Sequence, residues 1–359
     1  MPIIAHSALP AFAQLQTEGV HVLTPYRAQR QQIRELHIGL LNMMPDAALQ
    51  ATERQFLRLI GESNPVAQFH VHPFSLPQIV RHPETQAYIN RYYDTFDNLR
   101  NEGLDALIIT GANVLGTELA DQPFWHPLQR VLDWAAKTVT STLCSCLATH
   151  AVLQSRYQQK RQRQAEKIWG VYRHQVIDPR HPLTRQVNTR FDVPHSRWNA
   201  VTPAQFDAAR LPILVQSAEV GVHLATSPDG LRFVLFQGHP EYDAISLLKE
   251  YKRQIQQFIS GDCPEMPPLV THYFSHRSRA ILTEYDHQVR QARRTDTVAP
   301  VFPESLLIPD LQNTWHDSAQ VIMSNWVGLV YQLTHDDRQQ PFMDGVDPNN
   351  PLANLNTGD

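Results

Sequence analysis

The sequence predicts an α/β protein with a mostly parallel, doubly wound sheet, helices on both faces of that sheet, and a strand-rich second half. Short apolar runs alternate with segments of helical spacing over residues 36–157. The run LDALIITGAN (104–113) leads into a glycine, so the chain turns where a strand ends. Open α/β sheets build their sites at such carboxyl ends. Several β-prone runs separated by turn residues then follow between residues 168 and 243.

Each element of the first half has its own local signal. The run HIGLLNMMP (37–45) is short, apolar and closed by Pro45, which is typical of a strand buried on both faces. The segment 48–63 has apolar residues at helical spacing, with Gly61 placed to end the helix. Further strands are predicted at 69–76, 104–113 and 139–144, and further helices at 124–137 and 146–157. This alternation predicts a parallel sheet.

The second half departs from that alternation. The basic stretch 156–167 is predicted to be a helix end and a solvated loop, and antiparallel ribbons are predicted over 168–177, 212–230 and 231–243. A helix is expected from about Ala244 to Ile259, and one more within 302–333. We divide the chain into an N-terminal lead-in packed on the core (1–35), one domain (36–335) and a C-terminal tail (336–359) expected to be mobile.

Composition excludes several classes of protein. Lys+Arg 31 against Asp+Glu 35 gives a formal net charge of -4 without a long basic run, which argues against nucleic-acid binding. No stretch approaches the roughly 18 uncharged apolar residues of a membrane-spanning helix, and the start of the chain lacks a signal-peptide pattern. Cys144, Cys146 and Cys263 cannot all pair, so we expect a reducing, cytoplasmic location.

Cys146 is the sharpest local signal for chemistry. It lies where an apolar strand gives way to a helix, with only Ser145 between, as in a nucleophile elbow. A thiol at a helix N-terminus is favoured as thiolate, and the free N–H groups there can stabilise an oxyanion. Two alternatives stay open: Cys144 and Cys146 could be small core residues, or they could belong to a metal site with His150. No Gly-rich phosphate loop is present.

A cysteine nucleophile needs a base from another strand end. The segment QGHPEYD (237–243) offers His239 directly after an apolar strand and a glycine. Glu241, two residues on, is placed to hydrogen-bond the imidazole and hold its tautomer. The sequence therefore predicts a Cys146, His239 and Glu241 unit.

These motifs carry a family resemblance. The chain resembles the class I glutamine-amidotransferase-like fold, but it reads CSCLATHA where amidotransferases have GxCxG, which argues against glutamine hydrolysis. Over residues 36–335 it is more similar to the homoserine O-succinyltransferase/O-acetyltransferase family. The motifs behind this resemblance are NMMP (42–45), TERQFLRL (52–59), TGAN (110–113), W-x8-W (125–134), TSTLCSC (140–146), EKIWGVY (166–172), PHSRW (194–198), GHPEYD (238–243) and SNW (324–326).

The resemblance implies an acyl-CoA:L-homoserine O-acyltransferase of methionine biosynthesis. Cys146 would take the acyl group, His239 would shuttle the proton, Glu241 would orient His239, and homoserine's hydroxyl would then attack. Arg253 would hold the acceptor carboxylate, although it could also be a solvated helix residue. The remaining implied positions are Ser196, Arg197 and Lys167 at the substrate site, and Leu147, Asn113 and Leu115 at the oxyanion and acyl-donor loop.

Two departures from the family pattern leave alternatives open. The chain reads MPDAALQATE where relatives often read MPKK directly before TE, so it has an insertion and lacks the lysine pair. The loop after TGA has Leu115 or Gly116 where acetyl-specific members carry Glu, which favours succinyl-CoA over acetyl-CoA.

L-Serine as acceptor and a catalytically idle binding or regulatory protein are the other hypotheses. We expect acyl-CoA and a small hydroxy amino acid as substrates, no separate cofactor, no metal, no nucleic-acid or membrane partner, and a homodimer.

Overall fold

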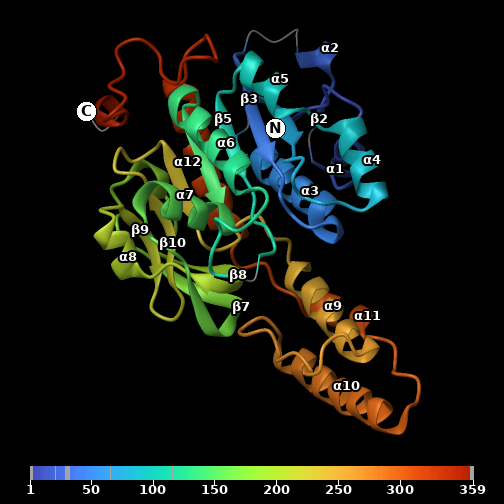
Figure 1. Ribbon diagram of the computed structural model, residues 1–359. Helices are drawn as coiled ribbons and strands as arrows, with labels where there is room; N and C mark the ends of the chain where they lie inside the picture. Colours follow the sequence, from blue (N-terminus) through green and yellow to red (C-terminus); the bar gives the residue numbers. More distant parts are fainter. Residues whose placement is uncertain (1–2, 21, 29–32, 65, 115, 356–359) are drawn as a thin grey trace.

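A computed structural model describes residues 3–20, 22–28, 33–64, 66–114 and 116–355. The described strands form one 11-stranded sheet in the order β2-β1-β4-β3-β5-β6-β11-β10-β9-β7-β8 (Figure 1). The strands are β1 (Ile3–Ile4), β2 (Val22–Leu23), β3 (Glu35–Leu41), β4 (Gln68–Phe74), β5 (Ala106–Ile109), β6 (Ser141–Ser145), β7 (Gln162–Val176), β8 (Arg190–Ala200), β9 (Ile213–Ser217), β10 (Gly221–Thr226) and β11 (Phe233–Phe236). The helices are α1 (Pro10–Thr17), α2 (Pro25–Ala28), α3 (Asp46–Ser63), α4 (Pro83–Tyr92), α5 (Phe96–Glu102), α6 (Trp125–Thr138), α7 (Leu147–Tyr157), α8 (Pro203–Ala208), α9 (Ser246–Ser260), α10 (His276–Thr295), α11 (Glu304–Leu307) and α12 (His316–Leu333).

The strands from β2 to β11 in the sheet order pair in parallel, and helices cover both of their faces. One face packs Phe56 of α3 and Trp326 of α12 into a buried cluster. The other face packs Leu128 of α6 and Val152 of α7 into a second cluster. Strands buried on both faces read as continuous apolar runs, as β5 does. The predicted α/β class with a mostly parallel, doubly wound sheet is confirmed.

The remaining strands pair antiparallel, through β11 with β10, β10 with β9, β9 with β7, and β7 with β8. This confirms the strand-rich second half. The loop predicted over 156–167 is wrong in part, because β7 begins at Gln162. The first residues of β7 are largely exposed, and the register shifts between Arg163 and Ile168, so no apolar alternation marked the strand. Gly61 does not end α3, which continues to Ser63.

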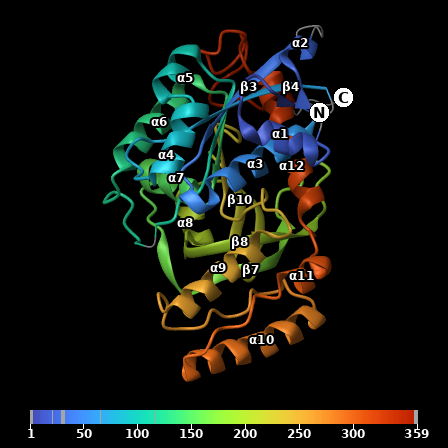
Figure 2. The ribbon, with the colours of Figure 1, turned by 90° about the vertical axis from the view of Figure 1, so that its right-hand side faces the viewer.

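The helices α9, α10 and α11 form a layer that projects beside β7 and β8 (Figures 1 and 2). This layer has its own apolar cluster, in which Trp169 of β7 packs with Tyr251, Tyr285 and Trp315. The helix α10 was not among the predicted elements, although Leu282, Tyr285, Val289 and Ala292 are buried at spacings of three and four residues. None of the helices in the described ranges is long and apolar enough to cross a membrane.

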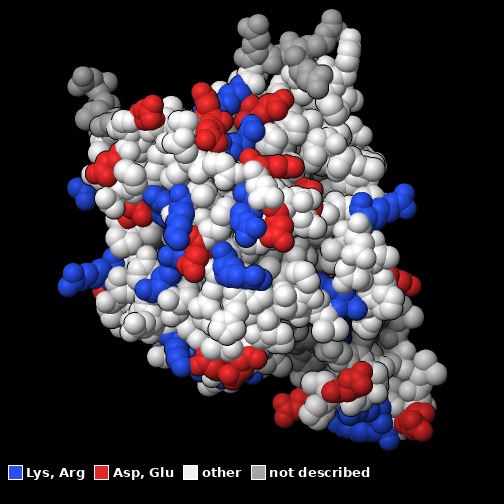
Figure 3. Space-filling model, turned by 45° about the horizontal axis from the view of Figure 1, so that its top comes forward, with Lys and Arg blue, Asp and Glu red and all other residues white. Residues whose placement is uncertain are grey.

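The described segments near both ends of the chain pack against the sheet. In the lead-in, β1 extends the sheet edge by pairing with β4 and β2. In the segment after residue 335, Arg338 lies 3.1 Å from the buried carboxylate of Asp105, and Phe342 and Leu352 are buried. The domain boundaries and the mobility of residues 336–359 stay predictions. On the face drawn in Figure 3, Lys and Arg side chains are interspersed with Asp and Glu, as the net charge of -4 suggests.

Gly170 joins the projecting layer to the sheet, and its substitution tests that junction. The Val171 amide donates to the Thr271 carbonyl and the Thr271 amide donates to the Trp169 carbonyl, both at 3.0 Å. A Cβ at Gly170 would lie 2.3 Å from the Thr271 oxygen. We predict that Gly170→Ala lowers the free energy of unfolding by about 1–3 kcal/mol, measured by urea denaturation.

Gly328→Ala is the matched control, because a Cβ at Gly328 in α12 meets nothing within 4 Å. The free energy of unfolding of that variant should be higher by about 0.4–1 kcal/mol. Equal stability of the two variants would show that the close approach at Gly170 does not constrain the fold.

Candidate active site

Three parallel strands end side by side and place the site. Ser145 at the end of β6 pairs with Phe236 at the end of β11, and Cys144 pairs with Ile109 at the end of β5. Because parallel neighbours end at the same edge of a sheet, the residues that follow each strand meet there. Cys146 and His239 follow β6 and β11 in this way.

Cys146 occupies a constrained elbow between β6 and α7. Its backbone has φ 51 and ψ -106, an uncommon conformation for a residue with a side chain. The Cys146 amide donates to the Phe236 carbonyl at 2.8 Å. The Thr149 hydroxyl donates to the carbonyls of Cys144 and Phe236, also at 2.8 Å. These bonds hold the thiol at the start of α7, as in a nucleophile elbow.

His239 connects the thiol to a carboxylate. Its Nδ1 lies 2.8 Å from Glu241 Oε1, and both side chains are buried. A carboxylate accepts, so Nδ1 carries the proton and Nε2 is the ring nitrogen left for the Cys146 thiol, which His239 also hydrogen-bonds. Gly238 permits this placement, because a Cβ there would lie 2.6 Å from Val193 Cγ1. The structure thus brings the three predicted residues together.

The charges around Cys146 favour a thiolate. Burial by itself raises the pKa of the Cys146 thiol, but His239 and Arg197 outweigh it and hold the pKa below the ordinary value of 9.0. For His239, burial lowers the pKa, while Glu241 and Cys146 raise it to about 10. Both shifts favour the thiolate and imidazolium form of the pair. Cys144 differs, since burial raises the pKa of its thiol.

Glu250 of α9 gathers two of the predicted substrate-site residues. Its Oε2 accepts from the Ser196 hydroxyl at 2.6 Å and from Trp169 Nε1 at 3.1 Å, and it lies 3.5 Å from Lys167 Nζ. Its Oε1 accepts from the Tyr242 hydroxyl at 2.8 Å. Burial raises the pKa of Glu250, but Lys167 and these hydroxyls lower it by more, so the net pKa is below its ordinary value and the carboxylate is charged.

Tyr242 links this Glu250 network to His239. Its ring stacks on the His239 ring with centroids 4.3 Å apart. In the sequence, Tyr242 stands out only as part of GHPEYD, and Glu250 is not among the predicted site residues. No sequence motif marks Glu250. An acidic residue on an amphipathic helix is ordinarily solvated, so its sequence position predicts no role. Only the packing of α9 against β7 and β8 gives it a role.

The two predicted arginines have different surroundings. Arg197 is buried, its Nη2 donates to the Val220 carbonyl at 2.7 Å, and its Nε and Nη1 have no hydrogen-bond partner. Its charge contributes to the lowered pKa of Cys146. Arg253 is exposed on α9, one turn after Glu250. The structure therefore places Arg197, and not Arg253, beside the thiol.

The predicted donor loop follows β5. A Cβ on Gly111 would lie 3.5 Å from Cys146 Cβ, so this loop approaches the thiol. Asn113 is exposed, and Leu115 lies outside the described residues. Leu147 is the first residue of α7, so its N–H is among those left open at a helix start.

Arg161 holds the donor loop and was missed in the sequence, where it lies within a basic run. It is buried, and its Nη2 donates to the carbonyls of Val114, at 3.0 Å, and Gly116. Its Nε donates to the Thr117 carbonyl at 3.4 Å. Arg161 thereby fixes the loop on both sides of position 115.

The structure also bears on the alternative metal site at Cys144, Cys146 and His150. His150 Nε2 lies 3.0 Å from Gln237 Oε1, which gives it a hydrogen-bond partner inside the core. Within the described ranges, the group of side chains that could hold an ion includes none of these three residues. The core-residue reading holds for Cys144, which is fully buried.

The Cys146 and His239 pair predicts a pH profile for alkylation. The rate of Cys146 modification by iodoacetamide, followed by peptide mass spectrometry, should have its midpoint below pH 9.0 because the thiolate persists to lower pH. In His239→Asn the midpoint should rise, since burial remains and the cation is lost. Cys263 in the same digest controls for reagent loss. A midpoint that His239→Asn leaves unchanged would contradict the pairing.

Comparison with known proteins assigns the family. The family model described as homoserine O-succinyltransferase matches residues 2–336. A homoserine O-succinyltransferase of Thioalkalivibrio nitratireducens is 59% identical over 352 residues, covering 98% of this chain and 99% of the relative. One of Allochromatium vinosum is 58% identical over 353 residues, covering 98% and 99%.

Among solved structures, a glutamine amidotransferase from Methylobacillus flagellatus has a TM-score of 0.45 and 12% identity over 83% of this chain and 95% of that chain. A score this low adds no weight to the assignment. The sequence relatives suffice, since they match from end to end at more than half identity. The chain belongs to the homoserine O-succinyltransferase family, and it is an O-acyltransferase.

Proposed function

We propose that this protein transfers the succinyl group of succinyl-CoA to the hydroxyl of L-homoserine through an acyl-cysteine intermediate on Cys146. The observation that carries the proposal is the pairing of a low-pKa thiol on an elbow with His239 and Glu241. The full-length relatives named homoserine O-succinyltransferase support the substrates. The name of these relatives also supports a role in methionine biosynthesis. A cytoplasmic location, the lack of a separate cofactor and a homodimeric assembly stay predictions from the sequence.

The first half-reaction uses the resting ion pair. The Cys146 thiolate attacks the thioester carbonyl carbon, a new C–S bond forms, and the carbonyl oxygen becomes an oxyanion. The open N–H of Leu147 at the start of α7 is the candidate donor to that oxyanion, and Asn113 lies in the loop beside it. The bond to the CoA sulfur then breaks, and the His239 imidazolium gives its proton to the departing CoA thiolate.

The second half-reaction restores the ion pair. Neutral His239 takes the proton from the homoserine hydroxyl as its oxygen attacks the acyl-cysteine carbonyl. The C–O bond forms, the bond to Cys146 breaks, and the thiolate faces the imidazolium again. Glu241 holds the ring by its Nδ1 throughout, so Nε2 keeps facing the reacting atoms.

The acceptor carboxylate needs a cation. Arg253 is our candidate, because an exposed guanidinium one turn from Glu250 is free to take a ligand bidentately. Ser196 and Lys167 meet at Glu250 and would line the same substrate site. Arg197 is buried and supports the charge of Cys146, so its role belongs with the acyl-enzyme. The loop after β5 has no Glu at 115 or 116, which favours succinyl-CoA over acetyl-CoA.

The acyl-enzyme can be measured by intact mass. With succinyl-CoA and no acceptor, the protein should gain the mass of one succinyl group, and acetyl-CoA should label it more slowly. Cys146→Ala should gain none, whereas Cys144→Ala should be labelled normally because Cys144 is a buried core thiol. Adding L-homoserine should remove the label faster than adding L-serine. Labelling of Cys146→Ala would sink the assignment of the nucleophile.

The two arginines should separate the two half-reactions. Arg253→Ala should form the acyl-enzyme at a normal rate and raise the KM for homoserine roughly ten- to hundredfold, as expected for the loss of a charged hydrogen-bonded contact worth about 1.5–3 kcal/mol. Arg197→Ala should slow acylation itself, since the thiolate loses a neighbouring cation.

Gln256→Ala, an exposed change on the same helix, is the control for Arg253. A collapse of acylation in Arg253→Ala, with unchanged circular dichroism, would assign Arg253 to the donor side and leave Arg197 as the carboxylate partner.

A further inference from the structure

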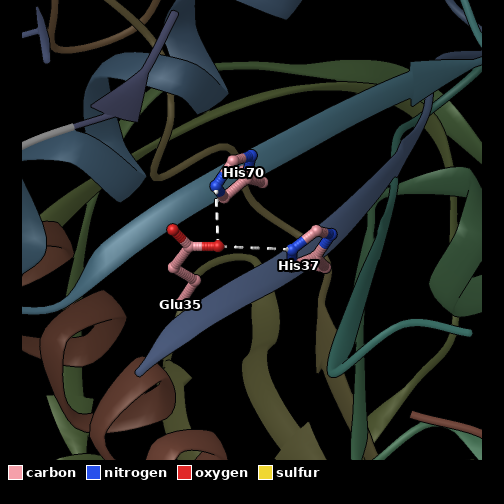
Figure 4. A group of neighbouring side chains, drawn as sticks. All are labelled: Glu35, His37 and His70. Atoms are coloured by element: carbon pink, nitrogen blue, oxygen red, sulfur yellow. Dashed lines mark ion pairs between the residues drawn. The ribbon is translucent and has the colours of Figure 1, made fainter. Parts of the chain in front are cut away.

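A cluster of histidines lies near the amino ends of β3 and β4, whereas Cys146 lies at the carboxyl ends of the parallel strands. Glu35 and His37 are two residues apart near the start of β3, and His37 pairs in register with His70 of β4. Because side chains alternate along a strand, Glu35, His37 and His70 point to one face (Figure 4). Cys146 instead follows the carboxyl end of β6, which runs parallel to these strands within the sheet.

Three ligand atoms converge in this cluster. Glu35 Oε2 lies 3.2 Å from His70 Nε2 and 4.0 Å from His37 Nε2. All three atoms lie within 4.8 Å of one another. Figure 4 shows both rings turned toward the carboxylate. His70 Nε2 is buried and has no hydrogen-bond partner, although the Glu35 oxygen is near.

A further histidine supports the cluster from behind. Asp94 Oδ2 lies 3.1 Å from His72 Nδ1, and His72 Nε2 lies 3.1 Å from His37 Nδ1. Because His37 Nδ1 is engaged by His72, Nε2 is the ring nitrogen of His37 that faces Glu35. The orientation of the His37 ring is therefore fixed by its partners.

The kinds of ligand in the cluster suit a cation. Glu35 brings one carboxylate to two imidazoles, which is a ligand set that transition-metal ions take in proteins. Arg338, a nearby cation, is already paired with Asp105 at 3.1 Å.

We propose that Glu35, His37 and His70 bind a divalent transition-metal ion, with Zn²⁺ as the best fit. Imidazole and carboxylate ligands suit zinc, whereas calcium and magnesium prefer oxygen ligands alone. Zinc bonds of about 2.0–2.2 Å put neighbouring tetrahedral ligand atoms about 3.3 Å apart. The 3.2 Å separation fits this spacing, and the 4.0 Å separation has to shorten by about 0.7 Å when the ion binds.

The surrounding residues give the ion an outer shell and a fourth position. The chain from His37 through His72 to Asp94 is the kind of carboxylate–histidine support that orients metal-binding imidazoles. Three protein ligands leave one tetrahedral position for water. The ion joins β3 to β4, so it stabilises that part of the sheet. This site differs from the expectation in the sequence analysis that the chain holds no metal.

The test measures metal binding directly. The chain is treated with chelator, desalted and titrated with Co²⁺ by absorption spectroscopy and with Zn²⁺ by calorimetry. We use the Cys146→Ala protein, because the Cys146 thiolate and His239 could themselves bind zinc. One equivalent should bind, with the visible bands of tetrahedral Co²⁺ and no sulfur-to-cobalt charge transfer.

Substitutions then locate the ion. His37→Ala and His70→Ala should abolish binding, and Glu35→Gln, which keeps the shape of the side chain, should weaken it at least tenfold. Asp94→Asn should keep one equivalent but weaken binding about 10- to 100-fold. His287→Ala, an exposed change on α10, is the matched control and should bind as the parent does. Zn²⁺ should raise the melting temperature of the control and leave that of His70→Ala unchanged.

Several results would overturn the site. These are no binding to the Cys146→Ala protein, or binding that Glu35→Gln and His70→Ala both leave unchanged. Glu35→Gln keeps the test decisive if a histidine variant fails to fold, which circular dichroism would reveal. None of these readouts depends on acyl transfer, so a failure here is separate from a failure of the proposed activity.

Discussion

The parallel pairing of β6 with β11 is the constraint on which the rest of the site depends. The register Ser145 with Phe236 brings the ends of two strands level, although they are about ninety residues apart in the chain. Cys146 and His239 each follow one of these ends, and the Cys146 amide is bonded back to Phe236. A shift of one residue in this register would turn every side chain of β11 to the other face and separate Cys146 from His239.

Burial and pairing act together on the charged groups around Cys146. Ionising a buried thiol, imidazole or carboxylate costs free energy when no counter-charge is near, because the protein interior solvates ions poorly. Here every charge has a near counter-charge: His239 lies between Cys146 and Glu241, and Glu250 faces Lys167. The cost of burial is therefore offset within the network, and the ions are held in fixed positions. Such a preorganised arrangement is what an acyl transfer through a thiolate needs.

The residues at the carboxyl ends of the parallel strands and those near the amino ends are held by different kinds of structure. At the carboxyl ends of β6 and β11, Cys146 and His239 follow the strands on connecting segments rather than lying within a regular strand. At the amino edge, Glu35, His37 and His70 are held on regular strands, where spacing is fixed by the sheet. Fixed spacing suits an ion of fixed bond length, whereas turning loops suit an acyl donor and an acceptor that must enter and leave.

The sequence by itself determined the α/β class, the parallel alternation through β6 and α7, and the residues Cys146, His239 and Glu241. These have local signals, because an apolar run, a turn residue and a reactive side chain lie next to one another in the chain. The membership of the family was likewise visible in short motifs. The exposed start of β7 was not visible, since its polar residues show no apolar alternation. The strand β8 was not visible either, since its buried positions include the polar residues His195, Arg197 and Asn199.

Only the tertiary structure decided which distant residues act together. Glu250 and Arg161 have ordinary sequence surroundings, and they gain roles because α9 packs on β7 and because β7 begins beside the donor loop. The same holds for Arg197, which is buried beside Cys146, whereas Arg253 is exposed. Glu35, His37 and His70 also converge only because β3 pairs with β4 in one register. Sequence spacing fixes contacts along one helix or strand, but contacts between elements depend on how the sheet is ordered and packed.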